Sequence, residues 1–200
     1  MRPYLTLILI FGFLSCRQIN STKKLATYDL KYSAFYWHFN QQTNNFEFYL
    51  VHYVDIDREG NYVLMLHDVW RDKPKYFKGA IGDTIRECID TTFLNDNFKT
   101  DYSYSTKPNF IYDGFTYCLD YRTQNNERKK ILFIPHDSPA KINILSSLLD
   151  TLIYSSKSEI LDTIYIAAYT KQLKEFAYKV DQPPPPPTKT ILFKPPKIKE

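Results

Sequence analysis

The feature that most constrains the fold is a run of alternating side chains at residues 46–56. Apolar or aromatic residues recur there at every second position, which is the period of a β-strand with one buried face. The predicted buried face consists of Phe46, Phe48, Leu50, His52, Val54 and Ile56. A turn at 57–61 includes Gly60, and a second strand-like run follows at 62–70. The two runs therefore predict a β-hairpin whose buried face must be covered by other apolar surface.

The remaining pattern predicts more strands and amphipathic helices. The additional strands are expected at 34–40, 75–79, 115–121 and 130–134. One helix is predicted to begin with Asp83 as its N-cap and another with Ser138 as its N-cap, because short polar side chains favour that position. A third helix is predicted at 161–179, where a strand at 163–166 is the alternative.

This order of elements predicts an α+β fold. It would be an antiparallel sheet of hairpins with two or three helices packed on one face, followed by a proline-rich C-terminal tail. The expected divisions of the chain are 1–15, a signal peptide; 16–33, a lipidated N-terminus and tether; 34–180, a single α+β domain; and 181–200, the tail. Five consecutive prolines at 183–187 predict a polyproline II segment, serving as a spacer, as a strap across the domain's own sheet or as a recognition element.

The N-terminus carries the pattern of an export signal. Arg2 precedes an apolar run at 4–14, and Ser15 precedes Cys16. The residues Phe13-Leu14-Ser15-Cys16 resemble the lipobox of bacterial lipoproteins. The resemblance implies that Cys16 becomes the mature N-terminus, with a diacylglyceryl group on its sulfur and an acyl chain on its amine. Such a protein would be anchored in the cell envelope, and Arg17 directly after the cysteine favours the outer membrane.

The arrangement of strands and helices is also similar to that of small uncharacterised lipoproteins of Gram-negative bacteria, a likeness that implies no particular activity.

The chain has 26 Lys and Arg residues against 22 Asp and Glu residues, a balance too even for a nucleic-acid-binding protein. Its 17 Tyr and 14 Phe residues favour a partly exposed, aromatic sheet surface. The predicted partners are therefore the membrane, through the lipid on Cys16, and an envelope protein or glycan.

Histidines are the candidate metal ligands. His52 and His67 lie on the two strands of the first predicted hairpin, directly opposite with a four-residue turn and diagonal with a five-residue turn. His38 on the neighbouring strand is the third candidate ligand, since zinc requires three or four clustered ligands. A histidine between apolar strand residues is also a common hydrogen-bonded core residue, so no metal and no other cofactor is predicted.

Other catalytic patterns are absent from the sequence. There is no G-x-S-x-G elbow, and the five glycines are too scattered for a phosphate loop. Export permits a disulfide between Cys88 and Cys118. Cys88 lies on the apolar stripe of a predicted helix, and Cys118 lies on the strand face opposite the expected core. In that arrangement the two side chains point apart and cannot form a disulfide. A disulfide and two free thiols therefore both remain open.

These patterns predict an envelope-anchored lipoprotein that acts as a non-enzymatic binding or assembly module. The alternative is a small envelope hydrolase or metal-binding protein that uses His52 and His67.

Overall fold

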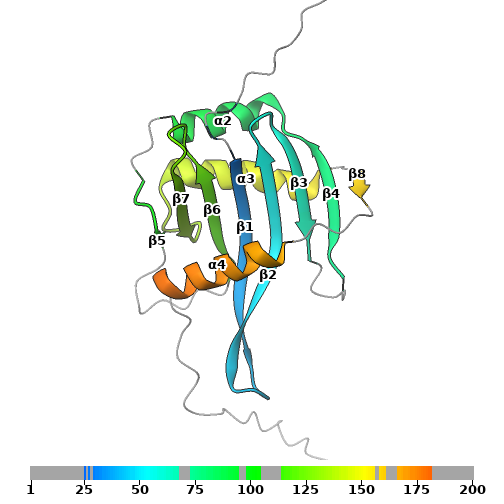
Figure 1. Cartoon of the computed structure of the whole chain (residues 1–200), viewed down its shortest axis with the longest axis vertical. Helices are drawn as coiled ribbons and strands as arrows, with labels where there is room; N and C mark the ends of the chain where they lie inside the picture. Colours follow the sequence, from blue (N-terminus) through cyan, green and yellow to red (C-terminus); the bar gives the residue numbers. More distant parts are fainter. Residues whose placement is uncertain are drawn as a thin grey trace, which may run out of the picture.

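The computed structural model describes a mixed α/β protein that is mostly sheet (Figure 1). The described residues are 25, 27, 29–67, 73–94, 98–104, 114–155, 158–160 and 166–181. The predicted combination of sheet and helices is confirmed at this level.

In the described part of the chain, eight strands form one sheet in the order β5-β7-β6-β1-β2-β3-β4-β8. The strands are β1 (Asp29–Asn40), β2 (Asn45–Asp57), β3 (Asn61–Leu66), β4 (Lys75–Ala80), β5 (Tyr102–Tyr104), β6 (Thr116–Arg122), β7 (Arg128–Phe133) and β8 (Ser158–Ile160). Neighbouring strands are antiparallel except β5 and β7, which are parallel. The sheet is therefore not built from hairpins alone, and β1, the first described strand, lies inside the sheet between β2 and β6.

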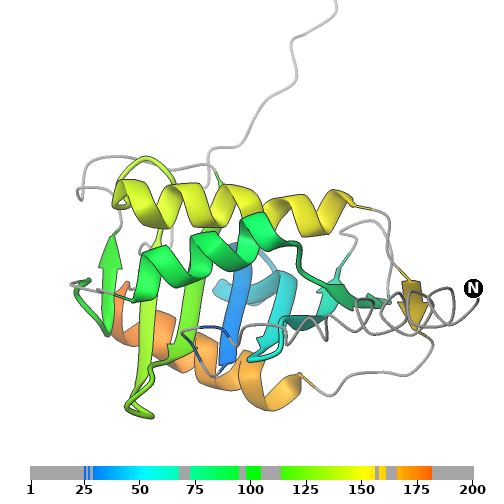
Figure 2. The same cartoon turned by 90° about the horizontal axis from the view of Figure 1, so that it is seen from above.

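Helices cover both faces of the sheet. Two of them, α2 (Asp83–Phe93) and α3 (Ala140–Tyr154), lie on one face, named here the α3 face (Figure 2). The third, α4 (Ala167–Val180), lies on the opposite face, named the α4 face. The prediction that the helices pack on one face of the sheet describes α2 and α3. It does not describe α4. The structure has three layers because both faces of the central strands are apolar.

Each face has its own core. On the α3 face, aliphatic and aromatic side chains pack between the sheet and the two helices, and members of this core are Tyr32, Val54, Ile89, Leu119, Ile131 and Leu149. On the α4 face the core is smaller, and its members include Phe35, Tyr53, Met65, Leu132, Leu173 and Phe176. Burying one such side chain contributes about 1.5–3 kcal/mol, so α4 is held mainly by this second core.

A β-bulge in β2 changes the expected alternation. Ala34 of β1 pairs with His52, whereas the next residue, Phe35, pairs with Leu50, so Val51 is an extra residue. The bulge shifts the side-chain period by one position. As a result Leu50 and Phe48 join the α4 face, while Val54 and the residues that alternate with it stay on the α3 face. The prediction that residues 46–56 alternate about a single buried face is therefore wrong.

Several predicted boundaries also shift. β1 begins at Asp29, so residues 29–33 belong to the sheet and not to a tether. β3 ends at Leu66. The N-cap positions are Gly82 and Pro139, one residue away from those predicted, and neither helix start has a side-chain cap.

The third predicted helix begins later than expected, at Ala167, and residues 161–165 lie outside the described part of the chain. Cys16, the signal peptide and the proline run at 183–187 also lie outside the described residues. The predictions made for them stay predictions.

Candidate functional site

A cavity of about 470 Å³ opens on the α3 face, between the sheet and the C-terminal part of α3. This cavity is named here the α3 pocket. Its polar lining includes His52, His67, Lys75 and Asp150, and its aromatic lining includes Phe115 and Tyr117. A volume of this size and a mainly apolar wall with a few polar groups are typical of small-ligand sites.

His52 is the most unusual group in the wall. Its side chain is 5% exposed, and its Nε2 atom has no hydrogen-bond partner among the described residues. Burial lowers the pKa of His52 to about 4, so the ring is neutral at pH 7. An unpaired buried polar atom costs about 1–3 kcal/mol, a cost that a ligand bound in the pocket can remove.

Tyrosine rings form the surroundings of this histidine. The centroid of the His52 ring lies 5.3 Å from that of Tyr32 and 6.1 Å from that of Tyr117. The Tyr32 and Tyr117 rings are stacked with centroids 5.8 Å apart. Since Tyr32 belongs to β1 and Tyr117 to β6, three adjacent strands build this wall.

Asp150 joins the wall from the helix side. Tyr32 donates a hydrogen bond from its hydroxyl to Oδ1 of Asp150 over 2.7 Å. Burial raises the pKa of the Asp150 carboxyl, and the hydrogen bond from Tyr32 acts in the opposite direction. Burial and the nearby carboxylate both raise the pKa of Tyr32, so its hydroxyl stays protonated and remains a donor.

His52 faces this pocket because it alternates along β2 with Val54 and Ile56, which lie on the α3 face. The extra residue Val51 turns Leu50 to the opposite face, so Leu50 packs toward α4 and does not lie beside His52. His67 lies close to the bulge, because its backbone N–H donates to the carbonyl oxygen of Val51 over 2.8 Å. Both predicted histidines therefore line one pocket, although His52 pairs across the strands with Leu66.

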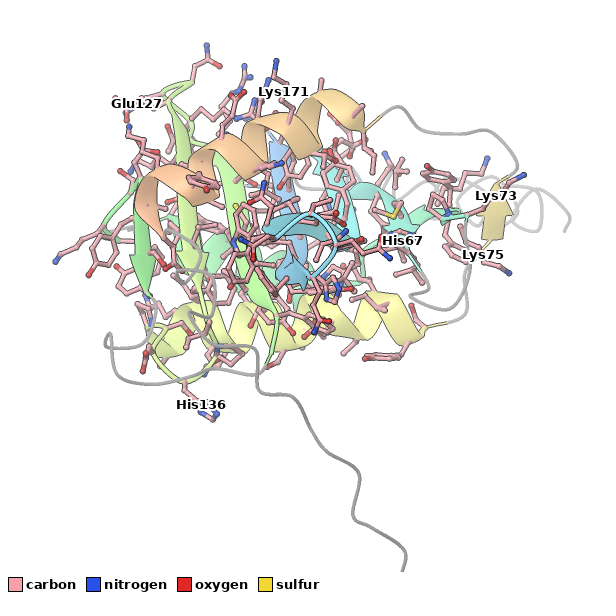
Figure 3. The ribbon with its side chains drawn as sticks, turned by 90° about the horizontal axis from the view of Figure 1, so that it is seen from below. His67, Lys73, Lys75, Glu127, His136 and Lys171 are labelled. Atoms are coloured by element: carbon pink, nitrogen blue, oxygen red, sulfur yellow. The ribbon has the colours of Figure 1, made fainter. Side chains whose placement is uncertain are left out.

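The third predicted metal ligand is distant. His38 lies four residues beyond Ala34, the partner of His52 on β1, which corresponds to roughly 13 Å at about 3.3 Å per residue. Figure 3 shows His67 and Lys75 toward the β8 end of the sheet and His136 well away from them. Within the described ranges, no group of three or more His, Cys, Asp or Glu side chains is placed to hold a metal ion. The three candidate histidines therefore do not form a cluster in the described part of the chain.

The two described cysteines are free and lie on opposite sides of the sheet. Cys88 packs against the core of the α3 face, and Cys118 is buried in the core of the α4 face. Burial raises the pKa of the Cys118 thiol, which opposes formation of a reactive thiolate. Of the two alternatives left open by the sequence, the structure has the one without a disulfide.

Asp150, Tyr32 and Tyr117 are site residues that the sequence pattern does not predict. The available signal was the position of Asp150, a carboxylate directly after Leu149 in the predicted helix. A charged side chain beside the apolar stripe of a helix either lies at the solvated edge of the helix or has a polar partner on the sheet that the helix covers. Its partner Tyr32 is 118 residues away in sequence, so spacing alone does not reveal the pair.

A second cavity of about 690 Å³ is lined by Asp55, Asp57 and Asn61 among others. Its carboxylates already have partners. Asp55 accepts hydrogen bonds from Lys31 at 3.0 Å and from Tyr53 at 2.8 Å, and Asp57 accepts from the backbone and the side chain of Asn61. We therefore regard the smaller α3 pocket, which holds the unpaired His52, as the better candidate site.

The distal part of the β1–β2 hairpin extends beyond α4 (Figure 1). In residues 36–49, named here the arm, β1 and β2 pair only with each other within the described sheet. One face of the arm carries the stacked rings of Tyr36 and Tyr49, with centroids 5.4 Å apart. On the other face Trp37 packs edge-on against Tyr178 of α4 at 5.5 Å, which braces the base of the arm.

The fold and the site together define a class: a three-layer α/β protein with a histidine-containing pocket beside an aromatic hairpin. No protein-family model matches this sequence, and no curated protein or solved structure is significantly similar to it. Among the helices that the structure describes, none is long and apolar enough to cross a membrane.

Proposed function

We propose that this chain is a lipid-anchored module of the bacterial cell envelope that binds a ligand in the α3 pocket and performs no catalysis itself. The anchor is Cys16, by its resemblance to the lipobox, and the outer membrane is the expected location. The observation that carries the binding function is the buried, unpaired Nε2 of His52 in the wall of a cavity of about 470 Å³.

The protonation of the pocket supports binding rather than hydrolysis. A general base works best when its pKa lies near the operating pH, whereas burial lowers the pKa of His52 to about 4. The neighbouring Asp150 accepts a hydrogen bond from the hydroxyl of Tyr32, and no hydrogen bond joins it to His52 among the described residues. Among the described residues no metal-ligand cluster is present to activate water. A hydrolase that uses His52 and His67 is therefore the less favoured function.

The test is histidine NMR on the acylated chain in lipid nanodiscs. With four histidines in the chain, ¹⁵N-histidine labelling gives a spectrum simple enough to assign by substitution. The probes are neutral ring fragments that each carry one hydroxyl or one amide. We expect some of them to shift the Nε2 resonance of His52 and to leave that of the exposed His136 unchanged. If no fragment shifts His52, or if bound fragments are hydrolysed, the proposal is wrong.

A matched pair of substitutions on α3 locates the binding. Ile153 lines the pocket, whereas Ile144 is 58% exposed. Ile153→Trp should fill the cavity and abolish the shift of His52, while Ile144→Trp should preserve it. Equal responses in the two variants would place fragment binding outside the pocket.

A further inference from the structure

A row of aromatic rings leads from the α3 pocket onto the arm. Tyr117 and Phe115 line the pocket, and the Phe115 side chain is 38% exposed. The centroid of Phe115 lies 5.9 Å from that of Tyr36, and Tyr36 stacks on Tyr49 with centroids 5.4 Å apart. The pocket and this face of the arm therefore form one continuous surface, named here the aromatic row.

Hydrogen-bonding groups accompany the row along its length. On the arm, Glu47 accepts hydrogen bonds from Asn40 at 2.6 Å and from Tyr49 at 2.8 Å. These bonds hold the carboxylate beside the Tyr49 ring and lower the pKa of Glu47, so it stays an acceptor at neutral pH. In the pocket, His52 and Asp150 supply the polar groups. Each end of the row thus combines ring faces with fixed polar atoms.

The charges in the pocket favour an uncharged ligand. Its described lining contains one carboxylate, Asp150, and one ammonium group, Lys75, while His52 is neutral at pH 7. A strongly anionic or cationic ligand would lack a matching excess of opposite charge. The ligand must nevertheless carry a polar group for His52, because an acyl chain or a purely apolar body would leave its Nε2 unpaired.

We infer that the ligand of the aromatic row is an uncharged oligosaccharide, with one sugar ring in the α3 pocket and the next rings over Phe115 and Tyr36. This inference rests on the proposed binding function. A pyranose ring offers a face of C–H groups that packs on aromatic rings, and its hydroxyls both donate and accept hydrogen bonds. A hydroxyl can therefore pair with Nε2 of His52 in either neutral tautomer of the ring.

The test is calorimetric titration of the acylated chain in nanodiscs with N-acetylglucosamine and glucose oligomers of two and four units. We expect the four-unit form of at least one series to bind about tenfold more tightly than the two-unit form, because only the longer chain reaches Tyr36. Phe115→Ala should remove most of this length dependence, whereas Ile144→Ala, an exposed apolar side chain elsewhere, should leave it unchanged.

Failure of this inference can be separated from failure of the proposed function. If neutral fragments shift His52 but no oligomer binds, the pocket is a binding site and the oligosaccharide class is wrong. A tetra-alanine peptide that binds in place of the sugars, or oligomer binding with no dependence on length or on Phe115, also overturns the inference. If neither fragments nor oligomers bind, both proposals fail.

Discussion

Tyr32 donates a 2.7 Å hydrogen bond from its hydroxyl to Oδ1 of Asp150 and thereby joins β1, inside the sheet, to α3. Tyr32 is fully buried, and the carboxyl of Asp150 is partly desolvated, so neither group has full access to water. The bond fixes the position of the pocket wall relative to the helix that covers it.

Removing the hydroxyl in Tyr32→Phe should lower the free energy of unfolding by about 1–2 kcal/mol. The loss should be larger at pH 8 than at pH 4, because the ionised Asp150 gains most from the donor. Urea denaturation at the two pH values measures both effects. Tyr154→Phe, at a tyrosine that is 87% exposed, is the control and should change stability little. Equal losses in the two variants would contradict this account.

His52 should make stability depend on pH. Its pKa is about 4 in the folded protein against about 6.5 when unfolded, so the unfolded state binds more protons between these values. Stability is therefore full above about pH 6.5 and should fall by up to roughly 3 kcal/mol as the pH falls to about 4. His52→Phe should flatten this slope, and His136→Phe, at an exposed histidine, should not.

The groups facing His52 must be considered in that measurement. They are the rings of Tyr32 and Tyr117 from the sheet, and the pocket-lining side chains of Asp150, Lys75 and His67. Asp150 contributes the opposite slope, because its pKa is raised in the folded state and its ionisation destabilises the fold as pH rises. The difference between wild type and His52→Phe isolates the histidine, and identical pH profiles would show that His52 is not buried as described.

A buried ion pair under α4 should contribute more than a surface pair. Asp120 is 1% exposed and accepts two hydrogen bonds from the Arg128 guanidinium at 2.7 and 2.8 Å, with Lys130 at 3.6 Å. Asp120→Asn leaves two cations without their counter-charge and should cost roughly 2–4 kcal/mol. The pair of Asp29 and Arg122, at 3.9 Å, is more exposed, so Asp29→Asn should cost less than about 1 kcal/mol. Chemical denaturation of both variants measures the two losses of unfolding free energy. Equal losses would contradict the expected ranking.

The turn between β2 and β3 requires glycine at position 60. Gly60 has φ of +84°, and a Cβ there would also meet the guanidinium of Arg86. Gly60→Ala should therefore cost about 1–2 kcal/mol. Gly82, by contrast, is the N-cap of α2, with extended backbone, no side-chain cap and open space where a Cβ would lie. Gly82→Ser should leave stability unchanged or raise it by about 0.3 kcal/mol. Thermal unfolding of the two variants makes the comparison, and a tolerated Gly60→Ala would contradict the turn geometry.

Lipidation has its own test. Cys16→Ser should abolish incorporation of a labelled fatty acid and move the protein into the soluble periplasmic fraction, because two or more acyl chains are needed for stable anchoring. Cys88→Ser, which removes a thiol from the folded domain, should keep both the label and the membrane association. Membrane association that survives Cys16→Ser would remove the basis of the proposed location.

Local periodicity was sufficient to predict individual elements. The strand expected at 46–56 is observed as Asn45–Asp57, and the helix expected after Ser138 is observed as Ala140–Tyr154, with Ile142, Leu145 and Leu149 buried. These predictions succeed because a strand or helix buries residues at its own period, which neighbouring positions in the chain reveal.

Local periodicity predicts only part of the candidate site. His52 and His67 were identified as a pair because they lie on one hairpin, and both line the α3 pocket. Asp150 and Tyr32 were missed because their contact spans 118 positions. The prediction of two or three helices on one face covers α2 and α3 but not α4, since the bulge at Val51 that helps to make the second face apolar depends on the pairing of β2 with β1.

The sequence by itself determined where the strands and helices form, through the spacing of apolar side chains, and it carries the lipobox-like signal at Cys16. The tertiary structure alone decided which face each side chain occupies and which distant residues meet. Strand order brings Tyr32 of β1 beside His52 and under Asp150 of α3, and the extra residue at Val51 turns Leu50 toward α4. The physical reason is that register and layer packing are set by contacts between segments far apart in the chain, which no local period encodes.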